Sequence, residues 1–157
     1  MSNKEKLISI KNTILEQNNA LQILSSKIDK RILDIINILH NNKGKIVVTG
    51  IGKSGHIGMK ISATLSSTGS PAIFINSTEA NHGDLGVIEK NDVILALSKS
   101  GETKEMLPII NYAKKNKIKL IAITANLNSY LSKNASITCN IPNIKESCPL
   151  NLAPTTS

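Results

Sequence analysis

The N-terminal quarter of the chain carries apolar side chains at helical spacing. Leucine and isoleucine recur mostly at intervals of three, four or seven positions, at Leu7, Ile10, Ile14, Leu21, Leu24, Ile28, Ile32, Ile35, Ile36 and Leu39. This spacing predicts helix over residues 5–40, either as two helices or as one helix bent near residues 17–19, because the asparagines there are poor helix formers. The following HNNKGK segment is typical of a helix end, since it contains a glycine.

Beyond residue 41, short apolar runs alternate with amphipathic stretches. The runs predict strands at residues 46–49, 72–76, 93–97, 120–124 and 137–141, and the stretches predict helices at about 55–67, 103–116 and 128–133. Strands that are apolar throughout and separated by helices are typical of a parallel sheet covered on both faces. We therefore expect an α/β fold, a three-layer α/β/α sandwich with a five-stranded parallel sheet and N-terminal helices.

Composition and length fit one domain. The chain has 157 residues, of which 40% are hydrophobic and 19% charged, so it is globular rather than disordered. We expect residues 1–40 to be a helical segment that packs on a domain formed by residues 41–157. Aromatic residues make up only 2%, so the core must consist of aliphatic side chains.

The net charge of +8 raises the possibility of an acidic partner. The lysines are scattered, with one weak cluster at Lys114, Lys115, Lys117 and Lys119 that has no neighbouring aromatic residue to stack on bases. A solvated lysine-rich face is therefore favoured over a nucleic-acid surface, and we expect no nucleic-acid partner.

Cysteine usage and hydropathy indicate a cytoplasmic protein. Cys139 and Cys148 lie outside any metal-binding or redox spacing, so we expect free thiols. The N-terminus MSNKEKL is polar, which excludes a signal peptide at this position, and no apolar stretch reaches the length needed to cross a bilayer. We expect no membrane partner.

The first motif, TGIGKSGHIG, follows the first predicted strand. Its glycines at 50, 52 and 55 match the G-x-G-x-x-G pattern of dinucleotide sites. That function requires an acidic residue at the end of the second strand, but the strand ends at Asn76 and the nearest acid is Glu79. The Walker pattern of nucleotide-binding loops is absent from the sequence. A nicotinamide site is therefore disfavoured, although a glycine-rich turn at a helix start still suits an anion.

The second motif, SKSGET, follows the third predicted strand. Ser98, Ser100 and Thr103 place three hydroxyl groups at a helix start, and Gly101 allows a ligand to approach the backbone. One serine would be enough for an ordinary helix cap, so we favour phosphate binding by hydroxyl and backbone N–H groups. Ligands of open parallel sheets bind at the carboxyl ends of the strands, which is where both motifs fall.

Acid–base candidates lie on several of the expected strand-end loops. They are Lys53, Glu79, His82, Asp84, Glu102, Glu105 and Glu146. Glu102 is equally explained as a helix cap, and His82 could be either a proton shuttle or an ordinary surface histidine. Groups on different loops can nevertheless converge on one pocket, as catalysis requires.

Four longer motifs carry a family resemblance. GIGKSGHIGMKISATLSSTGSP, EANHGDLGVI, ALSKSGET and KESCPLNLAPTTS resemble, in order and spacing, the sugar isomerase (SIS) domain and within it the D-arabinose 5-phosphate isomerase family. The resemblance implies a flavodoxin-like SIS fold and an aldose–ketose isomerase that interconverts D-ribulose 5-phosphate and D-arabinose 5-phosphate through an enediol. The product would serve synthesis of Kdo for lipopolysaccharide or capsule. It further implies a homotetramer or homodimer, with sites built across subunits and no cofactor.

The resemblance also implies the roles of individual residues. The residues expected to act in catalysis are Lys53, Glu105 and Glu146. The residues expected to bind the sugar phosphate are Gly52, Ser54, Gly69, Ser70, His82, Ser98, Ser100, Gly101 and Thr103. Glu146 is the first candidate for the base that moves the proton and Glu105 the second, with Lys53 stabilising the enediolate oxygen.

Two departures from the family bear on activity. Family members continue into a Ser-His-Pro-Gly-Gly segment with a catalytic histidine, and most then carry a pair of CBS domains, whereas this sequence stops at Ser157. A phosphosugar sensor that binds without turnover therefore stays open as an alternative. In addition, Asn76 stands where the family often has a metal-binding histidine, so we expect no bound metal.

Overall fold

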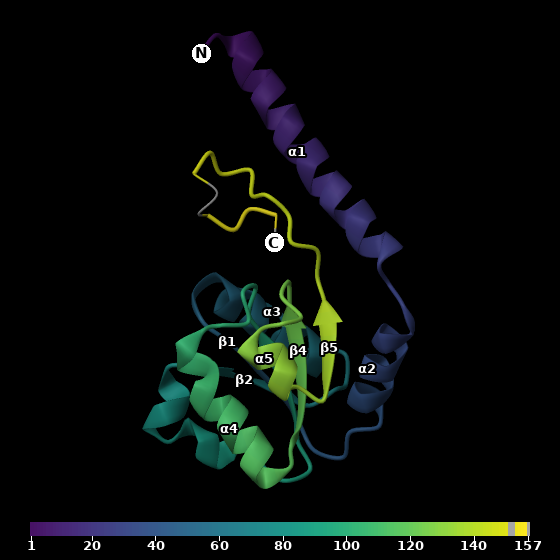
Figure 1. Cartoon of the computed structure of the whole chain (residues 1–157), viewed down its shortest axis with the longest axis vertical. Helices are drawn as coiled ribbons and strands as arrows, with labels where there is room; N and C mark the ends of the chain where they lie inside the picture. Colours follow the sequence, from purple (N-terminus) through teal and green to yellow (C-terminus); the bar gives the residue numbers. More distant parts are fainter. Residues whose placement is uncertain (151–152, 157) are drawn as a thin grey trace. The chain divides into compact units, whose positions relative to one another are not determined.

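The computed structural model describes residues 1–150 and 153–156, apart from the side chains of residues 81 and 82. Its contacts divide the chain into two compact units, one formed by Met1–Ile28 with Pro142–Ser157 and the other by Asp29–Ile141. The larger unit holds the sheet and the smaller unit holds the first helix (Figure 1). The expected division into residues 1–40 and 41–157 stays a prediction, because these units are defined by contacts alone.

The larger unit is built on a five-stranded parallel sheet. Its strands are β1 (Ile46–Gly50), β2 (Ala72–Asn76), β3 (Val93–Leu97), β4 (Lys119–Thr124) and β5 (Ile137–Asn140). They pair in the order β2-β1-β3-β4-β5, the order of flavodoxin-like sheets. The expected fold is confirmed, and the ends of every strand lie within one residue of the expected positions.

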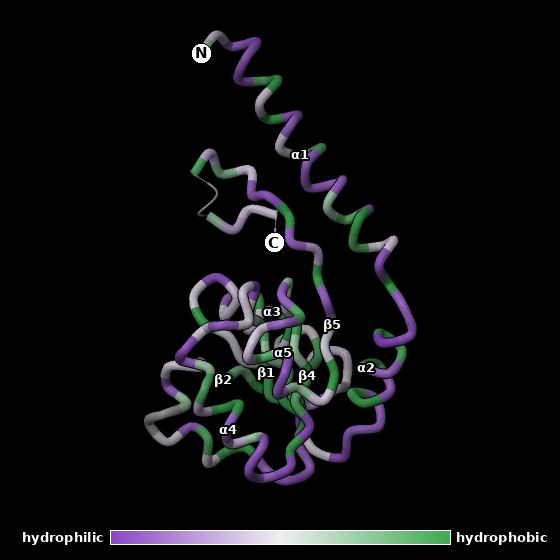
Figure 2. Tube along the Cα trace, viewed as in Figure 1, coloured by the Kyte–Doolittle hydropathy of each residue, from purple (hydrophilic) through white to green (hydrophobic). Residues whose placement is uncertain are grey.

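Helices cover both faces of this sheet. Successive strand residues point to opposite faces, so Val47 packs in one apolar cluster while Val48 packs in the other. Helices α2 (Lys30–His40) and α3 (Gly52–Ser67) cover the face that includes Val48, and α4 (Leu107–Asn116) and α5 (Tyr130–Asn134) cover the opposite face. Figure 2 shows apolar residues along β1 and β4, between these helical layers.

The glycines of the first motif set how closely α3 approaches the sheet. A Cβ atom on Gly58 would lie 2.8 Å from Cε2 of Phe74 on β2, and one on Gly55 would lie 3.2 Å from the carbonyl oxygen of Gly50. Both distances are shorter than ordinary contacts, so a larger residue at either position would require the Phe74 ring or the helix to shift. The helix begins at Gly52, three residues before the expected start at 55.

The predicted break near residues 17–19 is wrong, because α1 (Asn3–Ser26) runs through it. A residue with low helix propensity destabilises a helix by less than about 1 kcal/mol, and contacts made by the neighbouring turn can offset this loss. Within the smaller unit, Gln17 donates to the carbonyl oxygen of Thr155 at 3.0 Å, and Glu16 accepts from Ser147 at 2.8 Å. The helical pattern is interrupted instead between α1 and α2, where the side chain of Asp29 caps α2.

Candidate active site

The strand order places a topological switch point between β1 and β3, and a ligand crevice is expected at its carboxyl end. From β1 the chain crosses to β2 on one side, while β3 lies on the other side of β1. Loops that leave neighbouring strands in opposite directions open a ligand crevice between them, as in other doubly wound sheets. The TGIGKSGHIG loop after β1 and the SKSGET loop after β3 flank this point, as the sequence predicts.

In the first loop, glycine conformation brings the start of α3 close to the strand end. Gly52 has φ of 56°, in the left-handed region, and a Cβ atom on Gly50 would lie 3.1 Å from the carbonyl of Ser54. Lys53 is exposed and Ser54 is half-buried in the first turn of the helix. The loop therefore presents a backbone N–H cluster with an ammonium group beside it.

The helical segments that open after β1 and β3 have no side-chain cap, as is also the case for the 3-10 turns Glu79–His82 and Asp84–Val87. Side chains of Ser2, Asp29 and Ser129 cap α1, α2 and α5 respectively. Within the described residues, the N-cap of α3, Ile51, provides no side-chain cap, and neither does Thr103 at the start of the 3-10 turn Lys104–Met106 that leads into α4. No capping side chain occupies the first N–H groups of these two segments, and an anion is an acceptor that fits such a helix start.

In the second loop, the hydroxyl groups shape the backbone. The Oγ of buried Ser98 lies 2.8 Å from Oγ1 of Thr103 and accepts from the N–H of Gly101 at 3.0 Å. The Oγ of exposed Ser100 accepts from the N–H of Glu102 at 3.2 Å. These bonds hold the loop in a tight arch at the helix start, and direct contact of the three hydroxyls with phosphate stays a prediction.

The β4–α5 connection supports this arch through hydrogen bonds, a feature that no sequence motif indicates. The carbonyl oxygen of Lys99 accepts from the hydroxyl of Thr124 at 3.1 Å and from the N–H of Ala125 at 2.9 Å. Gly101 has φ of 68°, and a Cβ atom there would overlap Ser129. No sequence motif marks Thr124 or Ser129, because their roles arise only from the pairing of β3 with β4.

The two candidate bases have different surroundings. Glu105 is exposed in the turn Lys104–Met106, two residues after Thr103. Glu146 is buried in the smaller unit, where its Oε2 accepts from Thr155 N at 2.7 Å, Thr156 N at 2.8 Å and Thr155 Oγ1 at 3.2 Å. These three bonds tie the Oε2 of Glu146 to the segment that follows it.

Other predicted site residues lie elsewhere or are only partly described. Gly69 and Ser70 follow α3 and precede β2, so they lie at the amino edge of the sheet, opposite the two loops. The larger unit of one chain therefore does not bring this pair to the crevice. His82 ends the 3-10 turn Glu79–His82, but its side chain lies outside the described residues. The side chain of Asn76 accepts from the N–H of Thr78 at 3.0 Å.

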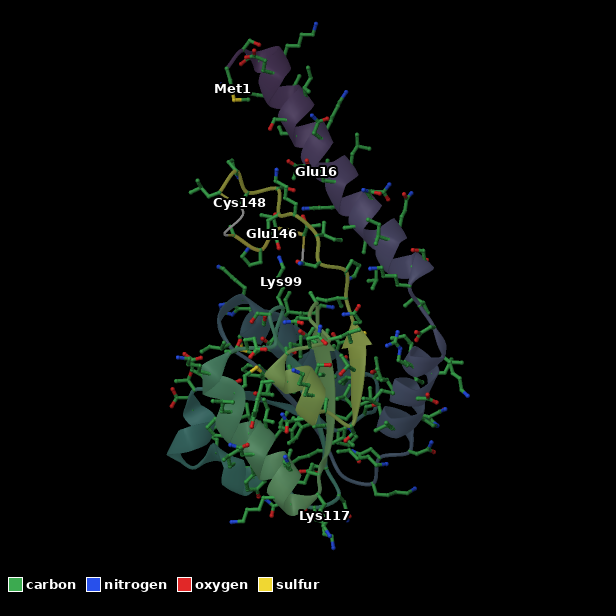
Figure 3. The ribbon with its side chains drawn as sticks, in the orientation of Figure 1. Met1, Glu16, Lys99, Lys117, Glu146 and Cys148 are labelled. Carbon is green, nitrogen blue, oxygen red and sulfur yellow. The ribbon has the colours of Figure 1, made fainter. Side chains whose placement is uncertain are left out.

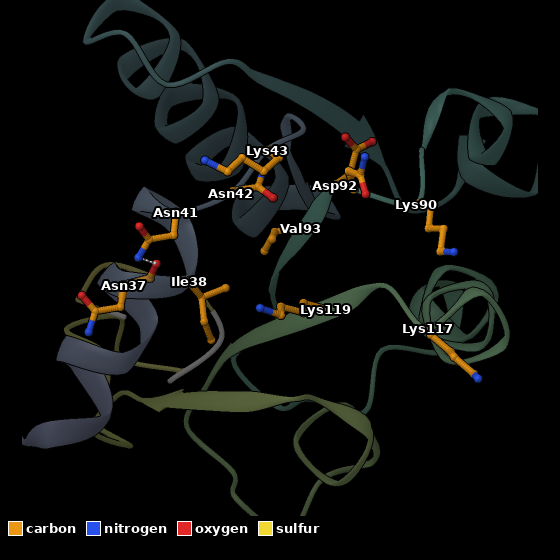
Figure 4. A pocket seen from close by; sticks show the side chains of 11 residues that line it. Asn37, Ile38, Asn41, Asn42, Lys43, Lys90, Asp92, Val93, Lys117 and Lys119 are labelled. Atoms are coloured by element: carbon orange, nitrogen blue, oxygen red, sulfur yellow. Dashed lines mark hydrogen bonds between the residues drawn. The ribbon is translucent and has the colours of Figure 1, made fainter.

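A hollow of about 440 Å³ at the amino edge accounts for part of the basic charge (Figure 4). Its lining includes Lys43, Lys90, Lys117 and Lys119, and residues from the last turn of α2. Helix C-termini carry partial negative charge, which nearby lysines offset. The last turn of α4 is likewise basic, with Lys114 and Lys115, and Lys117 is its C-cap residue. This placement supports the interpretation of the lysine cluster as a solvated face.

Within the residues that the structure describes, no helix combines the length and the apolar character that a membrane span requires.

Comparisons with known proteins agree with this geometry. The family model described as "SIS domain" matches residues 38–157. Arabinose 5-phosphate isomerase KpsF of Escherichia coli O6:H1 (strain CFT073) is 47% identical over 152 residues, covering 96% of this chain and 46% of that protein. Arabinose 5-phosphate isomerase KdsD of Pseudomonas aeruginosa is 43% identical over 155 residues, covering 99% of this chain and 48% of that protein. The chain thus spans about half the length of these curated relatives.

Among solved structures, that of the E. coli CFT073 protein c3406 in complex with arabinose 5-phosphate matches with a TM-score of 0.95. The two sequences are 36% identical, and the match covers 100% of this chain and 84% of that one.

Proposed function

The chain belongs to the SIS domain family, and on that premise we propose that it is the isomerase domain of a D-arabinose 5-phosphate isomerase. It would interconvert D-ribulose 5-phosphate and D-arabinose 5-phosphate. The observation that carries the proposal is the pair of uncapped helix starts on the loops after β1 and β3. The identity to KpsF and KdsD supports the choice of sugar.

The crevice suits the phosphate end of such a substrate. Backbone N–H groups at residues 52–54 and around Thr103 supply donors, and the two helix starts add partial positive charge. The exposed ammonium group of Lys53 adds a full charge next to them. If the phosphate is held at this point, the sugar chain of the substrate would extend away from the sheet, toward the exposed residues of the same loops.

Isomerisation then requires one base and stabilisation of one oxygen. In the direction from ribulose 5-phosphate, a carboxylate removes a proton from C1 and returns it to C2 through an enediolate. The hydroxyl proton of O1 passes to O2, so that the C2 carbonyl becomes a hydroxyl group and C1 becomes the aldehyde. Lys53 is the proposed donor to the enediolate oxygen. A positioned base is worth about two to four powers of ten in rate.

The surroundings of the two glutamates separate their possible roles. Glu105 can act without rearrangement, because its side chain is exposed on the loop after β3. Glu146 is buried, and its Oε2 accepts from the N–H groups of Thr155 and Thr156. We therefore keep both as candidate bases, and Glu146 would carry an additional role in ordering the segment that follows it.

An isomerase assay on this chain tests the proposal. Ribulose 5-phosphate is supplied and arabinose 5-phosphate is measured, for the wild type and for Lys53→Ala, Glu105→Gln and Glu146→Gln. Lys53→Ala and the substitution at the true base should each lower kcat at least about a hundredfold. Lys60→Ala is the matched control, because Lys60 is an exposed lysine on the same helix. Near-normal turnover in Lys53→Ala would contradict its assigned role.

The same assay distinguishes the sensor alternative. Binding of arabinose 5-phosphate by the wild type without turnover would identify a binding domain and overturn the enzymatic proposal for this chain. With turnover, the product would serve Kdo synthesis for lipopolysaccharide or capsule. Assembly into a homodimer or homotetramer is also proposed, and it would allow Gly69 and Ser70 of one copy to reach the crevice of another.

A further inference from the structure

Helix α5 uses its N-terminus to hold the SKSGET loop. The first N–H groups of a helix lack partners within the helix. In α5, the N–H of Tyr130 donates to Oε1 of Glu102 at 3.0 Å, and the N–H of Leu131 donates to the carbonyl oxygen of Gly101 at 3.0 Å. The next N–H, of Ser132, donates to Oγ of Ser129 at 3.2 Å. Two consecutive residues of the loop thus occupy two consecutive donors of the helix.

From this contact we infer that Glu102 is a positioning residue for the phosphate site, acting through α5. The inference rests on the proposed function, because the loop is taken to bind the phosphate of the substrate. Sequence reasoning treats Glu102 as a cap of its own helix, but its carboxylate caps the neighbouring one. The loop is thereby fixed to the β4–α5 connection by a side chain as well as by its backbone.

Charge explains why this arrangement suits an anion site. Glu102 lies between Gly101 and Thr103, inside the loop proposed to hold a phosphate, where a carboxylate aimed at the ligand would repel it. The hydrogen bond from the N–H of Tyr130 directs the carboxylate toward α5 instead. The uncapped starts of α3 and of the turn Lys104–Met106 are left for the ligand.

Tight packing makes the contact sensitive to change. A Cβ atom on Gly101 would lie 2.5 Å from Cβ of Ser129 and 2.9 Å from Oγ1 of Thr124, so the loop rests directly on this connection. Thr124 also donates to the carbonyl oxygen of Lys99 at 3.1 Å. Loss of the bond to Glu102 would allow the loop to shift relative to α3 and would misplace its donors.

The test compares Glu102→Ala, which removes the acceptor, with Glu102→Gln, which keeps one. Calorimetry measures the Kd of arabinose 5-phosphate and of inorganic phosphate, and the isomerase assay separates KM from kcat. We expect Glu102→Ala to raise both Kd values and KM about tenfold, with kcat changed less than about threefold, and Glu102→Gln to recover most of the affinity. Glu89→Ala is the charge-matched control, since exposed Glu89 bonds Lys45 at the amino edge.

Each outcome has a distinct meaning. If the wild type binds and Glu102→Ala binds equally well, or if Glu102→Gln is as weak as Glu102→Ala, the inference is wrong while the proposed function stands. If the wild type binds no sugar phosphate, the proposed function fails first. Should Glu102→Ala fail to fold, Glu102→Asp withdraws the carboxylate from the N–H of Tyr130 by one methylene group, and an unchanged Kd in that folded variant would overturn the inference.

Discussion

Replacement of Gly101 by alanine is expected to disable the phosphate loop. The residue has φ of 68°, and a non-glycine residue in this region costs about 1–2 kcal/mol. The new Cβ atom would also overlap Oγ of Ser129 and lie 2.9 Å from Oγ1 of Thr124. Relief of such overlap in a packed site costs about 1–3 kcal/mol. Together these effects lower the free energy of unfolding by about 3 kcal/mol, so Tm should fall by about 6–12 °C.

Two glycines provide matched controls that separate strain from overlap. Gly52 has φ of 56°, but a Cβ atom there meets nothing within 4 Å, so Gly52→Ala should cost only about 1 kcal/mol and lower Tm by about 2–4 °C. Gly86 has ordinary φ and open space, so Gly86→Ala should leave Tm nearly unchanged. Thermal unfolding monitored by circular dichroism measures all three.

Ligand-induced stabilisation completes this experiment. Arabinose 5-phosphate should raise Tm of the wild type and of Gly86→Ala, but not of Gly101→Ala, because the displaced loop no longer presents its donors. If Gly101→Ala and Gly52→Ala lower Tm by the same amount, the close packing of the loop against Ser129 and Thr124 is refuted. If the ligand raises the Tm of Gly101→Ala as much as that of the wild type, the link between this packing and ligand binding is refuted.

Two further predictions concern stability. Burial of Asp92 raises its pKa, but hydrogen bonds from the N–H of Glu89 and from Lys45 outweigh burial, so the pKa lies below its ordinary value. The ionised Asp92 therefore stabilises the fold above the pKa of an unfolded aspartate, near 4, and this stabilisation is lost as pH falls through the lower folded pKa. Urea unfolding should show that the free energy of unfolding of the wild type falls below about pH 4. Asp92→Asn should have a lower free energy of unfolding at pH 7 and a smaller decrease in acid, and equal decreases in the two proteins would contradict this. Gly58→Ala should lower the free energy of unfolding by about 1–3 kcal/mol, because its Cβ atom would lie 2.8 Å from Phe74, and unchanged stability would show that the ring moves freely.

The sheet could be predicted from sequence because its strands are short, apolar and bounded by polar turns. Helix boundaries and breaks were predicted less reliably, because tertiary contacts determine where a helix continues. Asparagines near residue 18 indicated a break, but bonds from Glu16 and Gln17 to the C-terminal segment sustain the helix. Glycine at 52 suggested a loop, yet its left-handed conformation opens α3.

Some residues of the candidate site could be predicted from the sequence and others could not. The residues of the TGIGKSGHIG and SKSGET loops could be predicted because each motif directly follows a strand. Thr124, Ser129 and the actual partner of Glu102 could not be found, because they depend on which strand lies beside β3. The resemblance also grouped Gly69 with these loops, although strand direction places it at the other edge of the sheet.

The most direct test of the account is the location of the sugar phosphate on the larger unit. Arabinose 5-phosphate is titrated into isotopically labelled protein, and changes in backbone amide chemical shifts are measured by NMR spectroscopy. The account predicts the largest changes at residues 52–55 and 98–105, with little change around the lysine-lined hollow at the amino edge, shown in Figure 4. In Figure 3 the labelled Lys99 belongs to the loop expected to respond and Lys117 to the edge expected to stay unchanged. Saturable shifts centred on Lys43, Asp92 and Lys119, without changes in the two loops, would contradict it.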